Sequence, residues 1–455
     1  MTARQFDVER MPREEMRTVQ QILDDDTGPA PAPPLRESAP SKLGTADVPI
    51  ERYVSREFLA LEYERLWSRV WQWACNEEDI PNVGDHTVYE IGDRSVFVVR
   101  SAPDAVKAFH NSCRHRGRQL KSAPGNAAHI TCPFHSWSWN LDGSLRGVPC
   151  RWDFPQVGEG THDLVEVRTE IYAGFVFLTF DNDAQPLAEA LDVIPEHFKH
   201  FPLDRRFTAA HVSKLVAVNW KAGMDAFLES YHVMSVHPQI VEFNADLNTQ
   251  YDVWHNANRM ISPLAEPSPA LGPGYDPAAV FESAAGYFAA QGEVPELPEG
   301  MAPRSAIAGM GREMMRQMLG VDLTSYSDSE IIDGIEYFVF PNWFPWAGIA
   351  NGIQYRFRPY RHDPDVCIMD VRLMFPLPPG PRPPAAPVRH LGLNEPFATV
   401  PELLSLAGVL DQDVDNMEAM QRGMKAAPQS GLVISDYQEA RIRHYHQRLD
   451  EWIGG

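Results

Sequence analysis

Two short stretches each pair a cysteine with a histidine, and they constrain the fold of this chain more than any other feature. CRHRG places Cys113 and His115 with one residue between them, and CPFHSWSW places Cys132 and His135 with two residues between them. The chain has only five cysteines, at positions 75, 113, 132, 150 and 367, which is too few and too scattered for a disulfide framework. In a reducing compartment, cysteines beside histidines are typical of metal ligands. The sequence therefore predicts a metal site built from two turns.

Two thiolates and two imidazoles suit either a tetrahedral metal ion or an iron–sulfur cluster. Zinc sites usually pair cysteine with cysteine and histidine with histidine, or use four cysteines, whereas each turn here supplies one of each. A Rieske [2Fe–2S] centre requires this mixture, because two thiolates bind one iron and two imidazoles bind the other. The pattern favours a Rieske centre. A zinc-stabilised binding module without catalytic activity is the alternative from another class.

Length, charge and hydropathy exclude several classes of protein. The 455 residues allow two domains, each with its own core. A formal net charge of -22 argues against nucleic acid as a partner, because phosphates are repelled over most of such a surface. The sequence contains neither a run of eighteen apolar residues nor the apolar stretch of a signal peptide near its N-terminus. We therefore expect no membrane span and a cytoplasmic protein.

Composition and periodicity divide the chain into three segments. Residues 1–44 combine a short helix with a Pro-rich arm. Residues 45–165 contain alternating segments typical of strands, joined by a Gly-Asp turn and an Asp-Gly hairpin, and carry the Cys/His pairs on turns. Residues 166–455 mix strands with long helices, and their Pro-, Gly- and Ala-rich stretch 262–305 reads as an irregular lid. We expect helices at 13–25, 55–71, 220–235, 401–424 and 436–453.

The stretch CRHRG…CPFHSWSWNLDGSLRGVP resembles the Rieske domain of non-haem iron ring-hydroxylating oxygenases, in their terminal (α) component. The resemblance extends over nearly the whole chain. It implies that the two Cys/His pairs bind the [2Fe–2S] cluster. It also implies an α+β fold, in which a β-rich Rieske domain precedes a helix-grip catalytic domain with an antiparallel sheet. The chain departs from the family at Ser136, where the second turn usually has Gly.

A second group of candidate ligands lies in NWKAGMDAFLESYHVMSVHP. On a helix, Asp225, Glu229 and His232 would share one face, because they are four and three residues apart. Pro238 disfavours the α conformation at His237, so the helix should end there and let His237 turn back towards the same metal. Two histidines and one carboxylate form the facial triad of a mononuclear Fe(II) site, with positions left open for O2 and substrate.

The carboxylate ligand comes from the resemblance. LDQDVDNMEAMQRGMKA offers Asp411, Asp413 and Asp415 on a predicted helix. The family places its aspartate eight residues before a Gln-Arg-Gly step, and counting back from Gln421 selects Asp413.

The resemblance also assigns a role to Glu229, at a position where the family most often has Asp. Glu229 is expected to contact His232 and, across an interface, His135 of the partner subunit, so that it bridges electron transfer. A carboxylate bound to a ligand histidine fixes its tautomer and raises its basicity. Because each cluster would then serve a neighbour's iron, we expect a homotrimer, with the presence of a β subunit left open.

The expected activity uses O2 and electrons from NAD(P)H to hydroxylate or dihydroxylate a small aromatic or other apolar substrate. The chain has no complete G-x-G-x-x-G and no plant-type cluster motif, so a separate reductase, with or without a ferredoxin, must supply the electrons. Demethylation of an O- or N-methyl group and oxidation of a quaternary amine fit the same machinery. We expect Met224, Asp225, Phe227 and Val233 to line the substrate pocket.

Basic residues surround the first Cys/His turn of an otherwise acidic chain. Arg114, Arg116, Arg118 and Lys121 form what we call the basic rim. We expect the rim to bind an acidic electron donor. Burial of these arginines at a subunit interface is the alternative.

Overall fold

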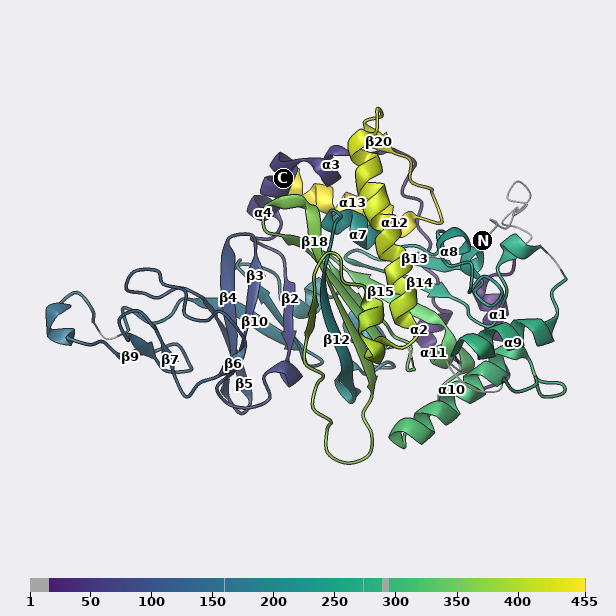
Figure 1. The fold of residues 1–455 in the computed structure, drawn as a ribbon, viewed down its shortest axis with the longest axis horizontal. Helices are drawn as coiled ribbons and strands as arrows, with labels where there is room; N and C mark the ends of the chain where they lie inside the picture. Colours follow the sequence, from purple (N-terminus) through teal and green to yellow (C-terminus); the bar gives the residue numbers. More distant parts are fainter. Residues whose placement is uncertain (1–15, 159, 273, 289–293, 351, 455) are drawn as a thin grey trace. The chain divides into compact units, whose positions relative to one another are not determined.

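The computed structural model describes residues 16–158, 160–272, 274–288, 294–350 and 352–454 (Figure 1). The chain divides into two compact units. The smaller unit contains Leu59–Ala190 and Tyr360–His362, and the larger unit contains Met1–Phe58, Leu191–Pro359 and Asp363–Gly455. Both units combine strands with helices, which confirms the predicted α+β class. Within the part of the chain that the structure describes, no helix is long and apolar enough to cross a membrane.

A seven-stranded antiparallel sheet forms the body of the smaller unit, in the order β2-β11-β10-β5-β4-β3-β6. The strands are β2 (Gln72–Asn76), β3 (Asp85–Ile91), β4 (Arg94–Ala102), β5 (Ala105–His110), β6 (Gly125–Asn126), β10 (Glu166–Tyr172) and β11 (Phe175–Thr179). The predicted boundary at 165 therefore differs from the observed unit, since β10 and β11 pair with β5 and β2 to complete this sheet.

A three-stranded sheet in the smaller unit carries the second Cys/His turn. It consists of β7 (Ile130–Thr131), β8 (Ser138–Trp139) and β9 (Leu145–Gly147). The turn lies between β7 and β8, and the predicted Asp-Gly hairpin joins β8 to β9. The first Cys/His turn follows β5. The two turns thus depend on strands from two different sheets.

An eight-stranded sheet forms the body of the larger unit, in the order β13-β14-β15-β16-β17-β18-β12-β19. Its strands are β12 (Arg206–Val216), β13 (Gln250–Val253), β14 (Ala257–Ser262), β15 (Gly334–Val339), β16 (Trp343–Pro345), β17 (Gly352–Tyr360), β18 (Asp363–Pro376) and β19 (Arg389–Leu391). Burial alternates residue by residue along β12, as expected where the two faces of a strand have different surroundings. The pairing of β12 with β19 is parallel, so the predicted antiparallel sheet has one exception, at its edge.

Helices and short turns complete the two units. The helices are α1 (Val19–Asp24), α2 (Pro33–Arg36), α3 (Glu51–Val54), α4 (Arg56–Arg65), α5 (Leu187–Ala190), α6 (Ile194–His197), α7 (Trp220–Asp225), α8 (Val233–Val236), α9 (Pro277–Phe288), α10 (Pro303–Leu319), α11 (Asp328–Ile332), α12 (Leu406–Ala426) and α13 (Ala440–Ile453). A two-stranded sheet joins β1 (Val48–Pro49) to β20 (Gly431–Leu432). The helix α13 lies against β13 and β14, and the Tyr445 ring contacts the ring of Phe338 from β15.

The helix α12 carries one polar residue of particular interest on its buried face. Its buried residues recur every three to four positions, as expected for an amphipathic helix packed on a core. They are Ala407, Leu410, Asp413, Val414, Met417, Gln421 and Met424. An aspartate at such a position must have a partner, because a buried unpaired carboxylate is strongly disfavoured.

The predicted helix over 220–235 is wrong as a single element. The helix α7 ends at Asp225, a turn follows, and α8 begins only at Val233. The backbone N–H of Ser230 donates to the Tyr251 hydroxyl rather than to a preceding turn of helix. Tertiary hydrogen bonds thus replace the helical ones between the two short helices. The predicted end before Pro238 is confirmed, because α8 ends at Val236 and His237, its C-cap, has a non-helical backbone with φ of -120° and ψ of 57°.

The stretch 262–305 is also more regular than predicted. It contains the twelve-residue helix α9 and the start of α10, each of which begins with proline. Proline is favoured at the first position of a helix, and the Ala-rich sequence that follows has high helical propensity. The weak periodicity of the stretch therefore did not imply an irregular loop, and its role as a lid stays a prediction.

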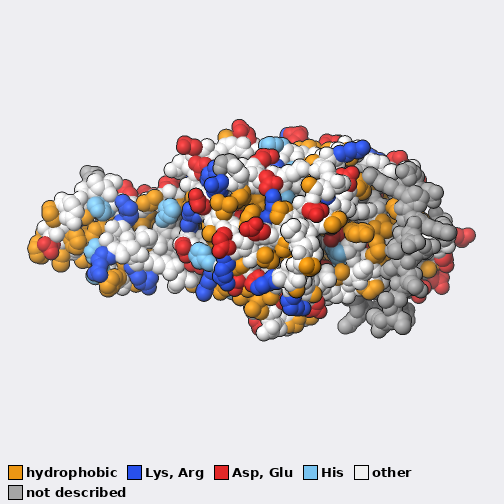
Figure 2. All heavy atoms as spheres, turned by 90° about the horizontal axis from the view of Figure 1, so that it is seen from above, with side chains coloured by type: hydrophobic (Ala, Val, Ile, Leu, Met, Phe, Trp, Pro, Cys, Tyr) orange, Lys and Arg blue, Asp and Glu red, His pale blue; other side chains and the backbone are white. Residues whose placement is uncertain are grey.

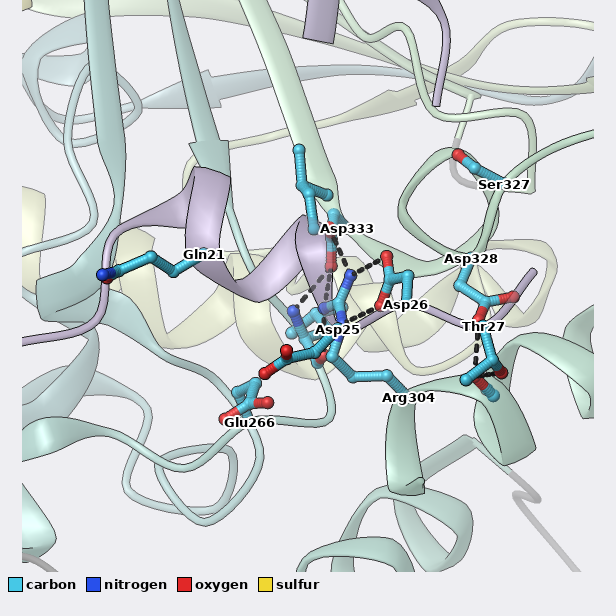
Figure 3. Close-up of polar contacts among 12 residues, drawn as sticks. Gln21, Asp25, Asp26, Thr27, Glu266, Arg304, Ser327, Asp328 and Asp333 are labelled. Carbon is cyan, nitrogen blue, oxygen red and sulfur yellow. Dashed lines mark hydrogen bonds and ion pairs between the residues drawn. The ribbon is translucent and has the colours of Figure 1, made fainter. Parts of the chain in front are cut away.

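The arm 16–37 is bound to the larger unit by ion pairs (Figure 3). Arg304, on α10, forms ion pairs with Asp26 of the arm at 2.8 Å and with Asp333 at 2.8 Å, and all three side chains are almost fully buried. Thr27 and Asp328 both hydrogen-bond to Ser305, the neighbour of Arg304. The arm is therefore part of the packed unit. Residues 13–15 of the predicted first helix lie outside the described residues.

Candidate metal centres

The two Cys/His turns have matching backbones. The N–H of Gly117 donates to the Cys113 carbonyl at 2.9 Å, and the N–H of Ser136 donates to the Cys132 carbonyl at 3.0 Å. Gly117 and Ser136 are both left-handed, with φ of 73° and 60°. This conformation favours glycine, so Ser136 occupies a position where a side chain costs free energy.

The turns bring the four predicted cluster ligands together. Cys113 and Cys132 are buried within one apolar cluster, and their thiols lie within hydrogen-bonding distance of each other. The rings of His115 and His135 are 4.8 Å apart, and His115 stacks on Trp137. Burial and the neighbouring Cys132 raise the pKa of Cys113, although the backbone N–H groups of residues 115 and 116 oppose the shift. A bound metal is what converts such buried thiols to thiolates.

A second group of three ligand atoms converges in the larger unit. One atom from each of His232, His237 and Asp413 lies within 4.8 Å of the other two. His237 Nε2 is 2.9 Å and His232 Nε2 is 3.6 Å from Asp413 Oδ1. His232 is at the N-terminal end of α8, His237 directly follows α8, and Asp413 comes from the buried face of α12. Residues about 175 positions apart in the sequence are therefore joined by helix packing.

The other ring nitrogen of each histidine, Nδ1, lies within hydrogen-bonding distance of an acceptor. His232 Nδ1 donates to Glu229 Oε1 at 2.7 Å, and the backbone N–H of His232 donates to Glu229 Oε2 at 2.9 Å. His237 Nδ1 donates to Gln412 Oε1 at 2.9 Å. When each ring is neutral, its proton is on Nδ1, and both Nε2 lone pairs face the carboxylate of Asp413. In that form the three atoms are electron-pair donors suited to a cation.

The charges around His232 support the same conclusion. Burial by itself lowers the pKa of His232, but the adjacent carboxylates of Glu229 and Asp413 outweigh it and raise this pKa to about 9. Without a metal, a proton neutralises this acidic site, and a metal ion would replace that proton.

Two family models match the chain, and together they cover most of it. The ring hydroxylating alpha subunit (catalytic domain) matches residues 196–455, and the Rieske [2Fe-2S] domain matches residues 70–158. The chain belongs to the ring-hydroxylating α-subunit family. Membership implies a Rieske cluster and a mononuclear iron, and it favours the cluster over the zinc site that the sequence left open. The two groups of donors described above fit these two cofactors.

Relatives within the α-subunit family have varied names. The chain is 32% identical over 200 residues to a carnitine monooxygenase oxygenase subunit of Escherichia coli strain K12, covering 42% of this chain and 52% of that protein. It is 33% identical over 213 residues to the anthranilate 1,2-dioxygenase large subunit of Burkholderia cepacia, covering 43% and 49%. The match thus spans only about half the length of these curated relatives.

Solved structures of Rieske oxygenases share the fold over nearly the whole chain. A quaternary ammonium Rieske monooxygenase in complex with L-carnitine has a TM-score of 0.64 at 17% identity, covering 91% of this chain and 99% of that one. A naphthalene 1,2-dioxygenase bound to phenanthrene has a TM-score of 0.62 at 18% identity, covering 92% and 95%. These likenesses confirm the predicted arrangement of a Rieske domain followed by a catalytic domain.

The residues expected to line the substrate pocket lie in two environments. Met224, Phe227 and Val233 are buried, and the Phe227 ring packs on Tyr355 at 4.8 Å. Asp225 does not share a helical face with Glu229, because α7 ends at Asp225. The Asp225 carboxylate instead accepts a hydrogen bond from the Tyr53 hydroxyl at 2.7 Å. A substrate-lining role for these residues stays a prediction, and Asp225 fits it least.

Sequence reasoning missed the hydrogen-bond partners of His237 and Asp225, which are Gln412 and Tyr53. Gln412 is next to Asp413 in the chain, yet no spacing rule links it to His237. Tyr53 also receives a contact from His446 Nε2 at 2.6 Å, which joins the N-terminal segment to α13. These pairs are separated by more than 170 residues, so only the folded chain reveals them.

Proposed function

We propose that this chain is the terminal oxygenase component of a multicomponent Rieske non-haem iron system. It would use O2 and electrons from NAD(P)H, delivered by a separate reductase or ferredoxin, to hydroxylate or dihydroxylate an aromatic or other apolar substrate. The observation that carries the proposal is the convergence of two Nε2 atoms on Asp413 in a member of this family. One face of the metal would then be occupied by protein ligands and the other left open.

The assignment of ligands follows from the donor sets. Cys113, Cys132, His115 and His135 would hold the cluster, and His232, His237 and Asp413 would hold Fe(II). When bound, the cluster supplies single electrons, and the ferrous ion supplies a binding site at which O2 is activated. Glu229 keeps a proton on His232 Nδ1 and so keeps the Nε2 lone pair available to the metal.

We further propose that electrons from the cluster of a second copy of the chain reach the mononuclear iron through Glu229. Glu229 is next to a partly accessible surface, since Tyr231 is 50% exposed and the His232 side chain is 20% exposed. In a trimer, His135 of the partner subunit would reach Glu229 from outside. A monomer with full activity would contradict this arrangement.

A second substrate class has specific support. The named relatives include carnitine and glycine betaine monooxygenase oxygenase subunits beside aromatic dioxygenases. The bridging position of this chain is Glu229 rather than the family's usual Asp, and Glu occurs there in some members that act on quaternary ammonium compounds. Aromatic rings such as Phe227 and Tyr355 can contact either an apolar ring or a quaternary ammonium group. Oxidation of a quaternary amine is therefore the second candidate.

Metal content and product identity test the proposal. Protein purified without oxygen should contain about three irons per chain and, after reduction with dithionite, show the low average g-value of an imidazole-ligated cluster. A substrate panel with a surrogate reductase should yield cis-diols or phenols from aromatic substrates, or an aldehyde from an N-methylated one. Zinc alone, or a colourless protein, would refute the proposal. E229Q should retain both metals but lose coupled turnover.

A further inference from the structure

The two metal-binding histidines of the larger unit have chemically different partners. His232 donates to the carboxylate of Glu229, whereas His237 donates to the neutral amide of Gln412. The His237 side chain is only 3% exposed, so water cannot easily replace this acceptor. Two acceptors therefore compete for the His237 proton: Gln412 Oε1 favours it on Nδ1, and Asp413 Oδ1, at 2.9 Å from Nε2, favours it there until a metal takes its place.

The side chain of Gln239 holds that amide in place. Gln239 Nε2 donates to Gln412 Oε1 at 2.7 Å, and Gln412 Nε2 donates back to Gln239 Oε1 at 3.3 Å. While Gln239 keeps its orientation, turning the Gln412 amide alone by 180° would place its NH2 group against both the NH2 group of Gln239 and Nδ1–H of His237. Such donor–donor contacts lose the hydrogen bonds and add repulsion. Gln412 Oε1 therefore accepts from both neighbours.

We propose that Gln412, oriented by Gln239, is a positioning residue that fixes the Nδ1–H tautomer of His237 and so directs its Nε2 lone pair at the metal. This inference rests on the proposed function, because it concerns the same iron site. Gln412 precedes the ligand Asp413 on α12, and Gln239 follows the ligand His237 by two residues. Each segment thus supplies one ligand and one member of the amide pair. The pair joins the two segments that must meet when the metal binds.

The test is the affinity of the mononuclear site for Fe(II), measured by competition with a chelator after that site alone has been depleted of iron. Q412L should weaken binding by about 10–100-fold, because His237 loses its acceptor. Q412E should bind as tightly as wild type, since either carboxylate oxygen can accept from Nδ1. Q239L should weaken binding in the Gln412 background and have no effect in the Q412E background, where no amide needs orienting.

Each outcome separates the inference from the proposed function. The visible spectrum of the Rieske cluster reports folding in every variant. If wild type does not bind Fe(II), or H237A binds it equally well, the proposed function fails. If H237A loses Fe(II) but Q412L binds as tightly as wild type, the inference alone is overturned. An equal loss from Q239L in both backgrounds would overturn the role of Gln239, which is exposed and so tolerates substitution without loss of the fold.

Discussion

At the scale of single residues, the backbone conformation of Ser136 carries a free-energy cost. It adopts φ of 60° at the position that matches Gly117 in the other turn, where φ is 73°. A Cβ added at Gly117 would meet only the Ser112 side chain, at 3.8 Å, so it would not clash. Substitutions at these two positions therefore test the cost of the backbone conformation separately from side-chain packing.

We expect S136G to stabilise the smaller unit and G117S to destabilise it. The left-handed conformation costs a non-glycine residue about 1–2 kcal/mol, and the entropy of glycine in the unfolded chain offsets part of this. The net change should be about 0.5–1 kcal/mol in each direction. Thermal unfolding, followed through loss of the cluster's visible absorbance, measures it. Shifts of the same sign in the two variants would contradict the explanation.

His444 should make stability depend on pH. Burial, helped by the charges of Arg448 and Arg441, lowers the pKa of His444 to about 4 from an ordinary value of 6.5. Its Nδ1 accepts from the Asn258 amide at 3.0 Å and its Nε2 donates to the His255 carbonyl at 3.2 Å. These two hydrogen bonds stabilise the neutral form of the ring in the folded state. The unfolded chain takes up the proton first as pH falls. Stability is therefore lost between about pH 6.5 and 4, with a slope of at most about 1.4 kcal/mol per pH unit.

The measurement compares the unfolding midpoints of wild type and H444Q at pH 7 and pH 5. Wild type should lose more stability than H444Q over this interval, because glutamine cannot take up a proton. An equal loss in both proteins would assign the dependence to other groups.

At the scale of elements, the junction between the N-terminal arm and α10 depends on Arg304. R304L would leave the buried carboxylates of Asp26 and Asp333 without a cation, which typically costs about 3–5 kcal/mol. Limited proteolysis should then cut the arm before the rest of the larger unit, and thermal stability should fall. The matched control is R316L on the same helix, where the ion pair with Glu313 is solvent-exposed and the loss should be within about 1 kcal/mol. Equal effects of the two variants would refute a special role for Arg304.

At the scale of the whole molecule, the exposed arginines of the basic rim contrast with the acidic chain that carries them. Arg114, Arg116 and Arg118 are exposed, and the Arg116 guanidinium lies over the Phe134 ring. Figure 2 shows basic and histidine side chains together at the end of the unit that carries β7 and β9. The chain as a whole has a net charge of -22. An acidic electron donor would therefore be attracted to the basic rim and repelled elsewhere.

We expect the rate at which a reduced acidic donor reduces the cluster to fall as salt is added, because ions screen this attraction. R116E should lower the rate at low salt by several-fold and weaken its salt dependence. R389E makes the same change of charge on the larger unit and should leave the rate nearly unchanged. Stopped-flow absorbance of the cluster measures each rate. The same rate in R116E and wild type would reject the basic rim as the binding surface.

The sequence by itself predicted the donor sets of the two candidate metal centres. The Cys/His spacing and the five-residue step from His232 to His237 are local properties of the sequence. They can therefore be recognised without knowledge of the tertiary structure. Asp413 needed the family resemblance, since Asp411 and Asp415 lie on the same helix with the same side chain. The structure separates them because only Asp413 lies on the buried face of α12.

Only the tertiary structure decided how those ligands are held. The helix predicted over 220–235 is broken because the Ser230 N–H donates to the Tyr251 hydroxyl outside it, and the Glu229 carboxylate accepts from the N–H of His232. The partners Gln412 and Tyr53 come from segments distant from His237 and Asp225, and pairing across such distances depends on how helices pack rather than on any spacing in the sequence. Local pattern sets which atoms can bind a metal. Packing sets which ring nitrogen of each histidine carries the proton. The reason is that hydrogen-bond acceptors in a buried site come from whichever segments the fold brings there.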